Sequence, residues 1–288
     1  MNVAYQGAPG AYSEIAAATL FPGGTLVAQR TFTDVFAALW SAAVAVAVVP
    51  VENTHAGSVL DVYDLLRTHA DVSVIGEVVV RVRHCLLALP GTRLEDVRIA
   101  RSHPHALAQV EAFLKDRGIR AEVAYDTAGA AHDIALGSDH TVAAVASRGA
   151  ARHYGLEILA EGIETTADNF TRFFAVARAG DSAAAERLAP SSAAGPLKTS
   201  LVYATKNVPG ALVRSLQPFA TAGLQLAKIE SRPSRAAAWE YVFYLDFEGD
   251  PATTPAREAL ALMRTCCEWV NVLGTYRAAT TVTVESDA

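Results

Sequence analysis

The sequence predicts two domains, an α/β domain over residues 1–180 and a smaller α+β domain over residues 198–281. Short apolar runs alternate with helical stretches in the first part, which is typical of a mainly parallel sheet covered by helices. Residues 181–197 are rich in Ala, Ser, Gly and Pro and are expected to form a linker. Beyond them, the predicted order is strand-helix-strand-strand-helix-strand, which is the ferredoxin-like arrangement.

The strands of the first domain are predicted from short apolar runs at residues 2–5, 44–51, 72–82, 98–100 and 142–146. The run AVAVAVV at residues 43–49 is apolar on both faces, as expected of a strand that helices cover on each side. Helices are predicted at residues 102–114, with Pro104 in the opening turn, and at residues 127–135.

The second domain is predicted from a change in the spacing of apolar and polar residues after the linker. Its strands are expected at residues 198–204, 224–230, 239–247 and 270–275, and its helices at residues 210–222 and 254–268. A short helix is expected within the linker at residues 183–188. A domain of about 80 residues with this order has the size of a small regulatory module.

The composition indicates a globular protein that binds neither nucleic acid nor membrane. Of 288 residues, 51% are hydrophobic and 19% are charged, and the net charge is −6 without a basic run. The most apolar stretch, residues 35–51, is interrupted by Ser41 and Pro50 and is shorter than the roughly 20 residues of a membrane span. Residues 1–5 lead directly into the first strand, so we expect no signal peptide.

The sequence carries no pattern that predicts a metal or a nucleotide cofactor. The glycine loop at residues 7–14 lacks both the GxGxxG and the GxxxxGK[ST] spacing. Cys85, Cys266 and Cys267 are an odd number without metal-ligand spacing. Adjacent cysteines rarely form a bridge, so we expect three reduced thiols in a cytoplasmic protein.

Four loop-to-helix junctions follow predicted strands, at residues 7–14, 52–58, 102–104 and 125–127. Ligands of α/β sheets bind beyond the carboxyl ends of strands, where helix N-termini present N–H groups and partial positive charge. Four such junctions in an acidic domain predict a small anionic ligand. Ordinary helix capping by Ser, Thr or Asn is the simpler explanation of any one of them.

Residues 168–174, DNFTRFF, place a hydroxyl and a guanidinium among aromatic side chains. The segment fits a catalytic or binding site. It also fits a plain strand with alternating faces, Thr171 on one face and Arg172 on the other.

Six short motifs, in order along nearly the whole chain, resemble those of the prephenate dehydratase family. They are GxxGxxSE at residues 7–14, PVEN at 50–53 with a following glycine, SHP at 102–104 with Gln109, TRF at 171–173, GALVRSL at 210–216 and ESRP at 230–233. The last two resemble the phenylalanine-binding signatures of that family's ACT domain. The resemblance implies a two-lobed, periplasmic-binding-protein-like α/β catalytic domain followed by a ferredoxin-like ACT domain.

The implied reaction removes water and carbon dioxide from prephenate to give phenylpyruvate, and aromatisation drives it without a cofactor or metal. The resemblance implies that Thr171 donates a hydrogen bond to the leaving hydroxyl. Because a threonine hydroxyl is a weak acid, Glu52 is expected to assist, held neutral by burial beside an apolar strand.

The resemblance also implies a set of substrate-binding residues: Ser13, Asn53, Thr54, Ser102, Gln109, Asn169 and Arg172. For Arg172, a fork to a substrate carboxylate and a structural ion pair are equally open. Thr54 stands where the family usually has Ser, and the hydroxyl is kept. His105 stands where the family often has Gln, and is either an extra proton donor or an exposed helix residue.

For the second domain, the resemblance implies binding of L-phenylalanine, which we expect to inhibit the enzyme, and a homodimer or dimer of dimers. The implied effector-binding residues are Asn207, Gly210, Ala211, Leu212, Val213, Glu230, Ser231, Arg232 and Pro233. Ordinary helix-start packing and an edge strand ending at a proline explain the same two motifs without a ligand.

Three other functions remain open. Arogenate dehydration on the same scaffold would need a carboxylate or carbonyl group to bind the substrate ammonium. A prephenate decarboxylase that does not aromatise the ring is disfavoured, because it has no use for the Thr171 hydroxyl. A non-catalytic solute-binding protein would share the α/β lobes, but such receptors normally carry a secretion signal and no attached amino-acid sensor.

Overall fold

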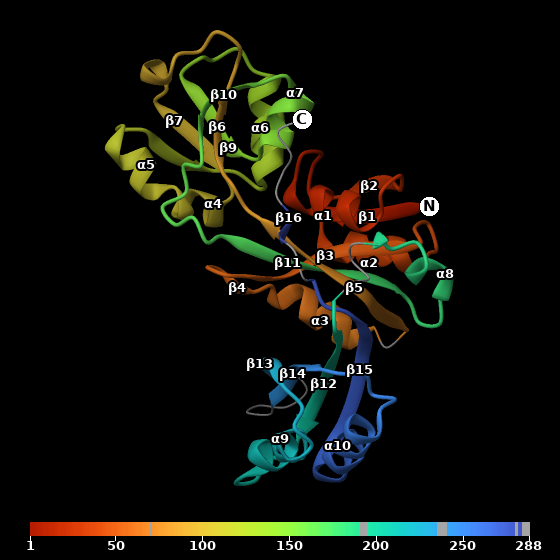
Figure 1. The fold of residues 1–288 in the computed structure, drawn as a ribbon. Helices are drawn as coiled ribbons and strands as arrows, with labels where there is room; N and C mark the ends of the chain where they lie inside the picture. The colour runs from red at the N-terminus through yellow and green to blue at the C-terminus, as the bar shows by residue number, and fades with distance from the viewer. Residues whose placement is uncertain (70, 191–194, 235–240, 280–281, 284–288) are drawn as a thin grey trace. The chain divides into compact units, whose positions relative to one another are not determined.

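The computed structural model describes residues 1–69, 71–190, 195–234, 241–279 and 282–283 (Figure 1). The described chain forms two compact units. Unit 1 comprises Met1–Val62, Val78–Phe173 and the strand β16 (Val282–Thr283). Unit 2 comprises Tyr63–Glu77 and residues 174–279.

The first sheet has seven strands, in the order β16-β5-β11-β3-β1-β2, with β4 paired to β3. Its other strands are β1 (Asn2–Gln6), β2 (Thr25–Gln29), β3 (Val46–Asn53), β4 (Gly57–Ser58), β5 (Val72–Arg81) and β11 (Phe170–Arg178). β1 pairs in parallel with β2 and β3. Residues 46–49 of β3 are fully buried, which confirms the strand predicted to be covered on both faces.

The second sheet lies within unit 1 and has five strands, in the order β10-β6-β9-β7-β8. They are β6 (Cys85–Ala88), β7 (Ile99–Ser102), β8 (Arg120–Val123), β9 (Val142–Ala146) and β10 (Glu157–Glu161). β7 is parallel to β8 and β9, as predicted, but β6 is antiparallel to β9 and β10. The antiparallel strands β6 and β10 are the two through which the chain enters and leaves this sheet.

The helices of the first 180 residues follow the strands. They are α1 (Tyr12–Leu20), α2 (Phe32–Trp40), α3 (Leu60–Thr68), α4 (Pro104–Gln109), α5 (Glu111–Asp116), α6 (Thr127–Ala135) and α7 (Arg148–Tyr154), with a 3-10 turn η1 (Leu94–Asp96). α6 confirms the predicted helix at residues 127–135. The helix predicted at residues 102–114 is broken at Val110, whose N–H is shared between the carbonyls of Ala106 and Leu107.

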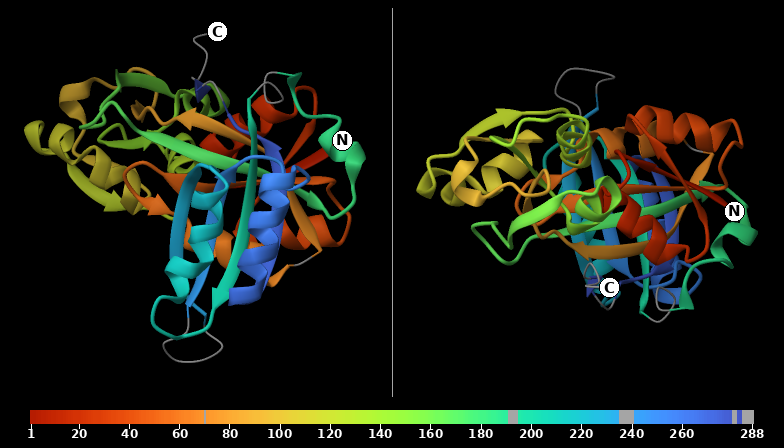
Figure 2. Two further views of the ribbon diagram at one scale, coloured as in Figure 1. Left: turned by 60° about the horizontal axis from the view of Figure 1, so that its bottom comes forward. Right: turned by 90° about the horizontal axis from the view of Figure 1, so that it is seen from above.

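Unit 2 contains a four-stranded antiparallel sheet in the order β13-β14-β12-β15. Its elements are β12 (Leu197–Thr205), α9 (Ala211–Thr221), β13 (Leu226–Pro233), β14 (Tyr241–Glu248), α10 (Thr254–Cys266) and β15 (Cys267–Arg277). The predicted ferredoxin-like order is confirmed, although residues 239 and 240 of one expected strand lie outside the described residues. α9 and α10 lie side by side on one face of the sheet (Figure 2), and Phe219 and Met263 pack there with Tyr203 and Phe247 in the core.

The division into units differs from the predicted boundaries. Tyr63–Glu77 belongs to unit 2, so β5 and β11 each run from one unit into the other. Within unit 2, the buried Glu77 carboxylate accepts hydrogen bonds from Lys198 Nζ at 2.8 Å and from the backbone N–H of Ala279 at 2.9 Å. A Cβ at Gly274 would overlap the Val74 carbonyl, so β15 approaches β5 backbone to backbone.

The expected linker is ordered in its described part. Residues 182–185 form the short helix α8 (Ser182–Ala185), as predicted, and Ala184 and Ala189 are buried. Residues 191–194 lie outside the described residues. Among the helices of the described chain, none is long and apolar enough to cross a membrane.

Candidate active site

A cavity of about 700 Å³ lies within unit 1, and residues on or next to strands of both of its sheets line it. Its wall includes Tyr12 and Ser13 of α1, Asn53 of β3, Leu60 and Asp61 of α3, His84, His103, His105, Gln109, Asp126, Thr127 and Thr171. All four loop-to-helix junctions that the sequence singled out contribute to this wall. The structure therefore brings them to one site.

Three of the four helix N-termini, those of α6, α4 and α1, differ in how they are capped. α6 is capped by Asp126, whose Oδ2 accepts the N–H of Gly129 at 3.0 Å, and α4 by His103, whose Nδ1 accepts the N–H of His105 at 3.3 Å. The capping explanation therefore accounts for these two junctions. α1 begins after Ala11 without a side-chain cap from that residue, and the Glu14 carboxylate of its first turn accepts the N–H of Gly10 at 2.6 Å.

Thr171 lies on β11 at the cavity wall, and its hydroxyl is held by Asn53. The Asn53 amide donates to Thr171 Oγ1 at 2.9 Å. The other end of the amide, Oδ1, accepts the backbone N–H groups of His55 and Ala56, both at 2.9 Å. These two backbone donors fix which end of the amide is oxygen, so the end that faces Thr171 is the NH2 donor. Its two protons are shared among three acceptors, which are Thr171 Oγ1, Asn169 Oδ1 and the Phe170 carbonyl at 3.1 Å. No described residue accepts the Thr171 proton, which is therefore available to a bound substrate.

The hydrogen bonds continue from Asn53 into the interior. Asn53 Nδ2 also donates to Asn169 Oδ1 at 2.8 Å, and Asn169 Nδ2 donates to Gln109 Oε1 at 2.9 Å. Gln109 Oε1 lies 2.7 Å from His84 Nε2. We call Thr171, Asn53, Asn169, Gln109 and His84 the amide network. The structure thus joins four predicted site residues through direct contacts and adds His84.

His84 was not among the predicted site residues. It directly precedes the apolar strand β6, where a histidine is most simply explained as part of the core. Its side chain is buried, with a relative exposure of 2%, and burial lowers the pKa of its imidazole below 6.5. No local pattern marks this position. Its contact with Gln109, 25 positions away in the chain, connects it to the other site residues.

Glu52 and Arg172 contact each other and do not line the cavity. Arg172 Nη1 lies 3.8 Å from Glu52 Oε2. The expectation that Glu52 is buried is wrong, because its side chain is 38% exposed where β3 emerges from the core. For Arg172, the structure shows the ion pair with Glu52, and a fork to a substrate carboxylate stays a prediction.

Ser102 and Thr54 use their hydroxyls within the protein. Ser102 is fully buried and donates to the Val145 carbonyl at 2.6 Å, so its hydroxyl has a partner within the protein and its contact with substrate stays a prediction. Thr54 Oγ1 donates to the Asp168 carbonyl at 2.8 Å and accepts the N–H of Phe170 at 3.0 Å. Thr54 thus fastens the start of β11 beside β3 instead of reaching the cavity. Ser13 remains a cavity residue.

The two remaining histidines of the wall stack on each other. The rings of His103 and His105 lie 5.3 Å apart at 25°. His105 is exposed on α4, as one of its two predicted descriptions has it, and it also lines the cavity, while its role as an extra proton donor stays a prediction. Burial and the neighbouring His105 lower the pKa of His103.

A second cavity, of about 280 Å³, lies within unit 2. It is lined by Thr205, Lys206, Asn207, Val208, Gly210, Ala211, Leu212, Val213, Tyr241 and Phe243. It brings together five of the predicted effector-binding residues, at positions 207 and 210–213. Gly210 has φ 77°, a left-handed conformation that favours glycine at the start of α9.

The other predicted effector residues do not line this cavity. Glu230, Ser231, Arg232 and Pro233 form the end of β13, an edge strand that ends at the proline. This confirms the edge-strand interpretation of the ESRP motif. Arg232 Nη2 donates to Asp64 Oδ2 of α3 at 2.8 Å.

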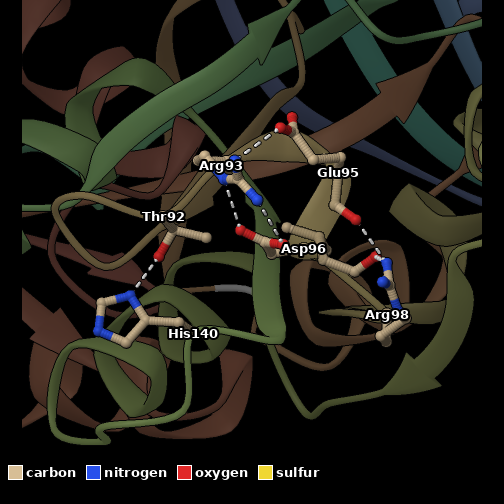
Figure 3. Close-up of polar contacts among 7 residues, drawn as sticks. Thr92, Arg93, Glu95, Asp96, Arg98 and His140 are labelled. Carbon is tan, nitrogen blue, oxygen red and sulfur yellow. Dashed lines mark hydrogen bonds and ion pairs between the residues drawn. The ribbon is translucent and has the colours of Figure 1, made fainter.

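A group of polar side chains away from the two cavities is paired within the protein. Around η1, Arg93 forms a two-pronged ion pair with Asp96, at 2.9 and 3.2 Å, and Thr92 Oγ1 contacts His140 Nδ1 at 2.6 Å (Figure 3). Arg98 donates to the Glu95 carbonyl at 2.6 Å. Among the described residues, no group of three or more His, Cys, Asp or Glu is placed to hold a metal ion.

Comparison with known proteins gives relatives over nearly the whole chain. The arogenate dehydratase/prephenate dehydratase 2 of Arabidopsis thaliana chloroplasts is 41% identical over 98% of this chain and 74% of that protein. The arogenate dehydratase 1 of Petunia hybrida is 42% identical over 96% of this chain and 66% of that protein.

Solved structures also match nearly the whole chain. A protein described as GqqA, a novel type of quorum quenching acylase, has a TM-score of 0.85 at 35% identity over 97% of this chain and 99% of its own. The prephenate dehydratase of Arthrobacter aurescens in complex with L-Phe has a TM-score of 0.85 at 28% identity over 97% and 90%. A family model described as prephenate dehydratase matches residues 3–181. The chain belongs to the prephenate dehydratase family.

Proposed function

We propose that this protein converts prephenate into phenylpyruvate, water and carbon dioxide in phenylalanine biosynthesis, as a carbon–oxygen lyase. The observation that carries the proposal is the Thr171 hydroxyl at the cavity wall. Asn53 donates to its oxygen at 2.9 Å, so its proton is directed to the departing hydroxyl of the substrate. Hydrogen bonding at that oxygen is what the reaction needs, because the bond that breaks leaves negative charge there.

The reaction balances without a further reagent. The ring carboxylate leaves as carbon dioxide, and its bonding electrons complete the aromatic ring while the carbon–oxygen bond to the hydroxyl breaks. One proton is consumed to release that hydroxyl as water. Thr171 stabilises the departing oxygen by its hydrogen bond, and solvent completes the proton balance. Enclosure in the cavity favours decarboxylation, because a carboxylate is less well solvated there than in water.

The substrate carboxylates are proposed to lie at helix N-termini. Among the described residues that line the cavity there is neither lysine nor arginine. The positive potential is proposed to come from backbone dipoles, including that of α1, which has no side-chain cap from Ala11. Ser13, in its first turn, lines the cavity and offers a hydroxyl to the same group.

Arogenate is the second candidate substrate. Its ammonium group needs a negative or carbonyl partner, and Asp61 and Asp126 both line the cavity. The plant relatives at 41% and 42% identity carry arogenate dehydratase in their names.

The effector domain is proposed to be an ACT domain that binds L-phenylalanine and inhibits the enzyme. The cavity of unit 2 and the L-Phe complex of the Arthrobacter aurescens protein support this. We also propose a homodimer or dimer of dimers, because Val208, Val213 and Tyr241 leave apolar surface around that cavity. A cytoplasmic location is proposed from the three free thiols.

Purified protein is expected to form phenylpyruvate from prephenate at neutral pH, at a rate that L-phenylalanine lowers. The product is followed by its ultraviolet absorbance in alkali, and arogenate is supplied in a parallel reaction with phenylalanine as the measured product. Turnover of arogenate alone would assign the second candidate. Binding of both compounds without turnover of either would defeat the dehydratase proposal and restore a binding-only role.

A further inference from the structure

His84 is a buried histidine that the proposed chemistry does not use. Its ring lines the cavity, with the ring of Tyr12 edge-on at a centroid distance of 6.0 Å. Its backbone N–H donates to Glu164 at 2.9 Å, and its Nε2 lies 2.7 Å from Gln109 Oε1. Its Nδ1 is buried without a hydrogen-bond partner among the described residues.

The direction of the hydrogen bonds fixes the protonation of this ring. The backbone N–H groups of His55 and Ala56 orient the Asn53 amide, and Asn53 then donates to Asn169 Oδ1. The other end of Asn169 must therefore be its nitrogen, which donates to Gln109 Oε1. An oxygen has no proton to give, so His84 Nε2 must carry one.

The neutral ring is the form that this environment favours. Burial lowers the pKa of His84, and a second proton, on Nδ1, would meet no acceptor among the described residues. His84 is thus a neutral donor at the inner end of the amide network, and Thr171 is the outer end.

We propose that His84 is a positioning residue for the dehydration, a role that rests on the proposed function. Its Nε2 proton holds Gln109, and through Gln109 and Asn169 it keeps the Asn53 amide turned so that the Thr171 proton faces the substrate. Without this donor, Gln109 is free to rotate, and the orientation of each amide further out is less strongly determined.

The test uses two substitutions of His84. His84→Phe keeps a ring beside Tyr12 and removes the donor, so kcat is expected to fall about 10- to 100-fold with KM within about threefold. His84→Gln restores a neutral N–H donor and is expected to recover kcat to within about fivefold of wild type. His153→Phe, on the exposed face of α7, is the matched control and should leave both constants unchanged.

A double-mutant cycle separates positioning from general damage. If His84 acts through Thr171, then adding His84→Phe to Thr171→Val should lower the remaining rate less than twofold. Equal losses in the Phe and Gln variants, or a full additional loss in the double mutant, would overturn the proposal. The Nε2-protonated tautomer is also visible by ¹⁵N NMR, and finding Nδ1 protonated would overturn the proposal even if the enzyme acted on neither substrate.

Discussion

Replacement of Thr171 by valine is expected to lower kcat about 10²- to 10⁴-fold while KM stays within about threefold of wild type. Valine has nearly the shape of threonine and lacks only the hydroxyl, so the fold and the cavity volume are kept. The lost group is the hydroxyl whose proton faces the substrate, because Asn53 already donates a hydrogen bond to its oxygen at 2.9 Å. The interaction strengthens as charge develops on the leaving oxygen, and its loss therefore appears in kcat and not in KM. Steady-state rates of phenylpyruvate formation measure both constants.

Thr171→Ser is the matched control, since it returns a hydroxyl and removes a methyl group. We expect it to retain at least about a tenth of the wild-type kcat. A valine variant with kcat within fivefold of wild type would show that Thr171 does not assist departure of the hydroxyl. A prephenate decarboxylase that does not aromatise the ring would then again be a candidate function.

Asn53→Asp is expected to lower kcat about 100-fold although Thr171 is still present. One carboxylate oxygen still accepts the N–H groups of His55 and Ala56, so the turn after β3 is preserved. The other oxygen has no proton to donate and becomes an acceptor for Thr171. The threonine proton is then directed into the protein and away from the substrate. The same assay measures the effect, and thermal unfolding verifies the fold.

A control variant with a new aspartate elsewhere separates the reversed hydrogen bond to Thr171 from the effect of the added charge. Asn271→Asp, on the exposed side of β15, adds the same charge in unit 2 and should leave kcat unchanged. Wild-type activity in Asn53→Asp would mean that the orientation of the Asn53 amide does not control the Thr171 proton.

The sequence predicts this fold where local patterns decide it. β9 is a purely apolar run and α6 follows a capping aspartate, and both appear at their predicted bounds. The break at Val110 was not predicted, because it depends on how α4 packs. Periodicity identifies the elements, but it does not say that residues 63–77 pack with the C-terminal half of the chain.

The candidate site was predicted in part, for the same physical reason. Thr171, Asn53, Asn169 and Gln109 were recognised because they stand in short motifs, and the structure connects them. Glu52 and Ser102 stand in equally good motifs, yet one is in an ion pair with Arg172 and the other is enclosed in the second sheet. A motif marks a position near the site, whereas the direction of its side chain is set by contacts with distant segments. His84 stands outside every motif and depends on such a contact alone.

The discontinuous make-up of the two units bears on how the chain folds as it is synthesised. The segment Tyr63–Glu77 leaves the ribosome more than 90 residues before its first partners in unit 2. The pairing of β16 with β5 likewise joins Val282 to Val79 across most of the sequence. Pairings between such remote segments slow folding, because the entropy cost of closing a long loop comes before any stabilising contact forms. The strand β5 thus stays incompletely paired until the segment that contains Val282 has been synthesised, and its unpaired edge is exposed during that interval.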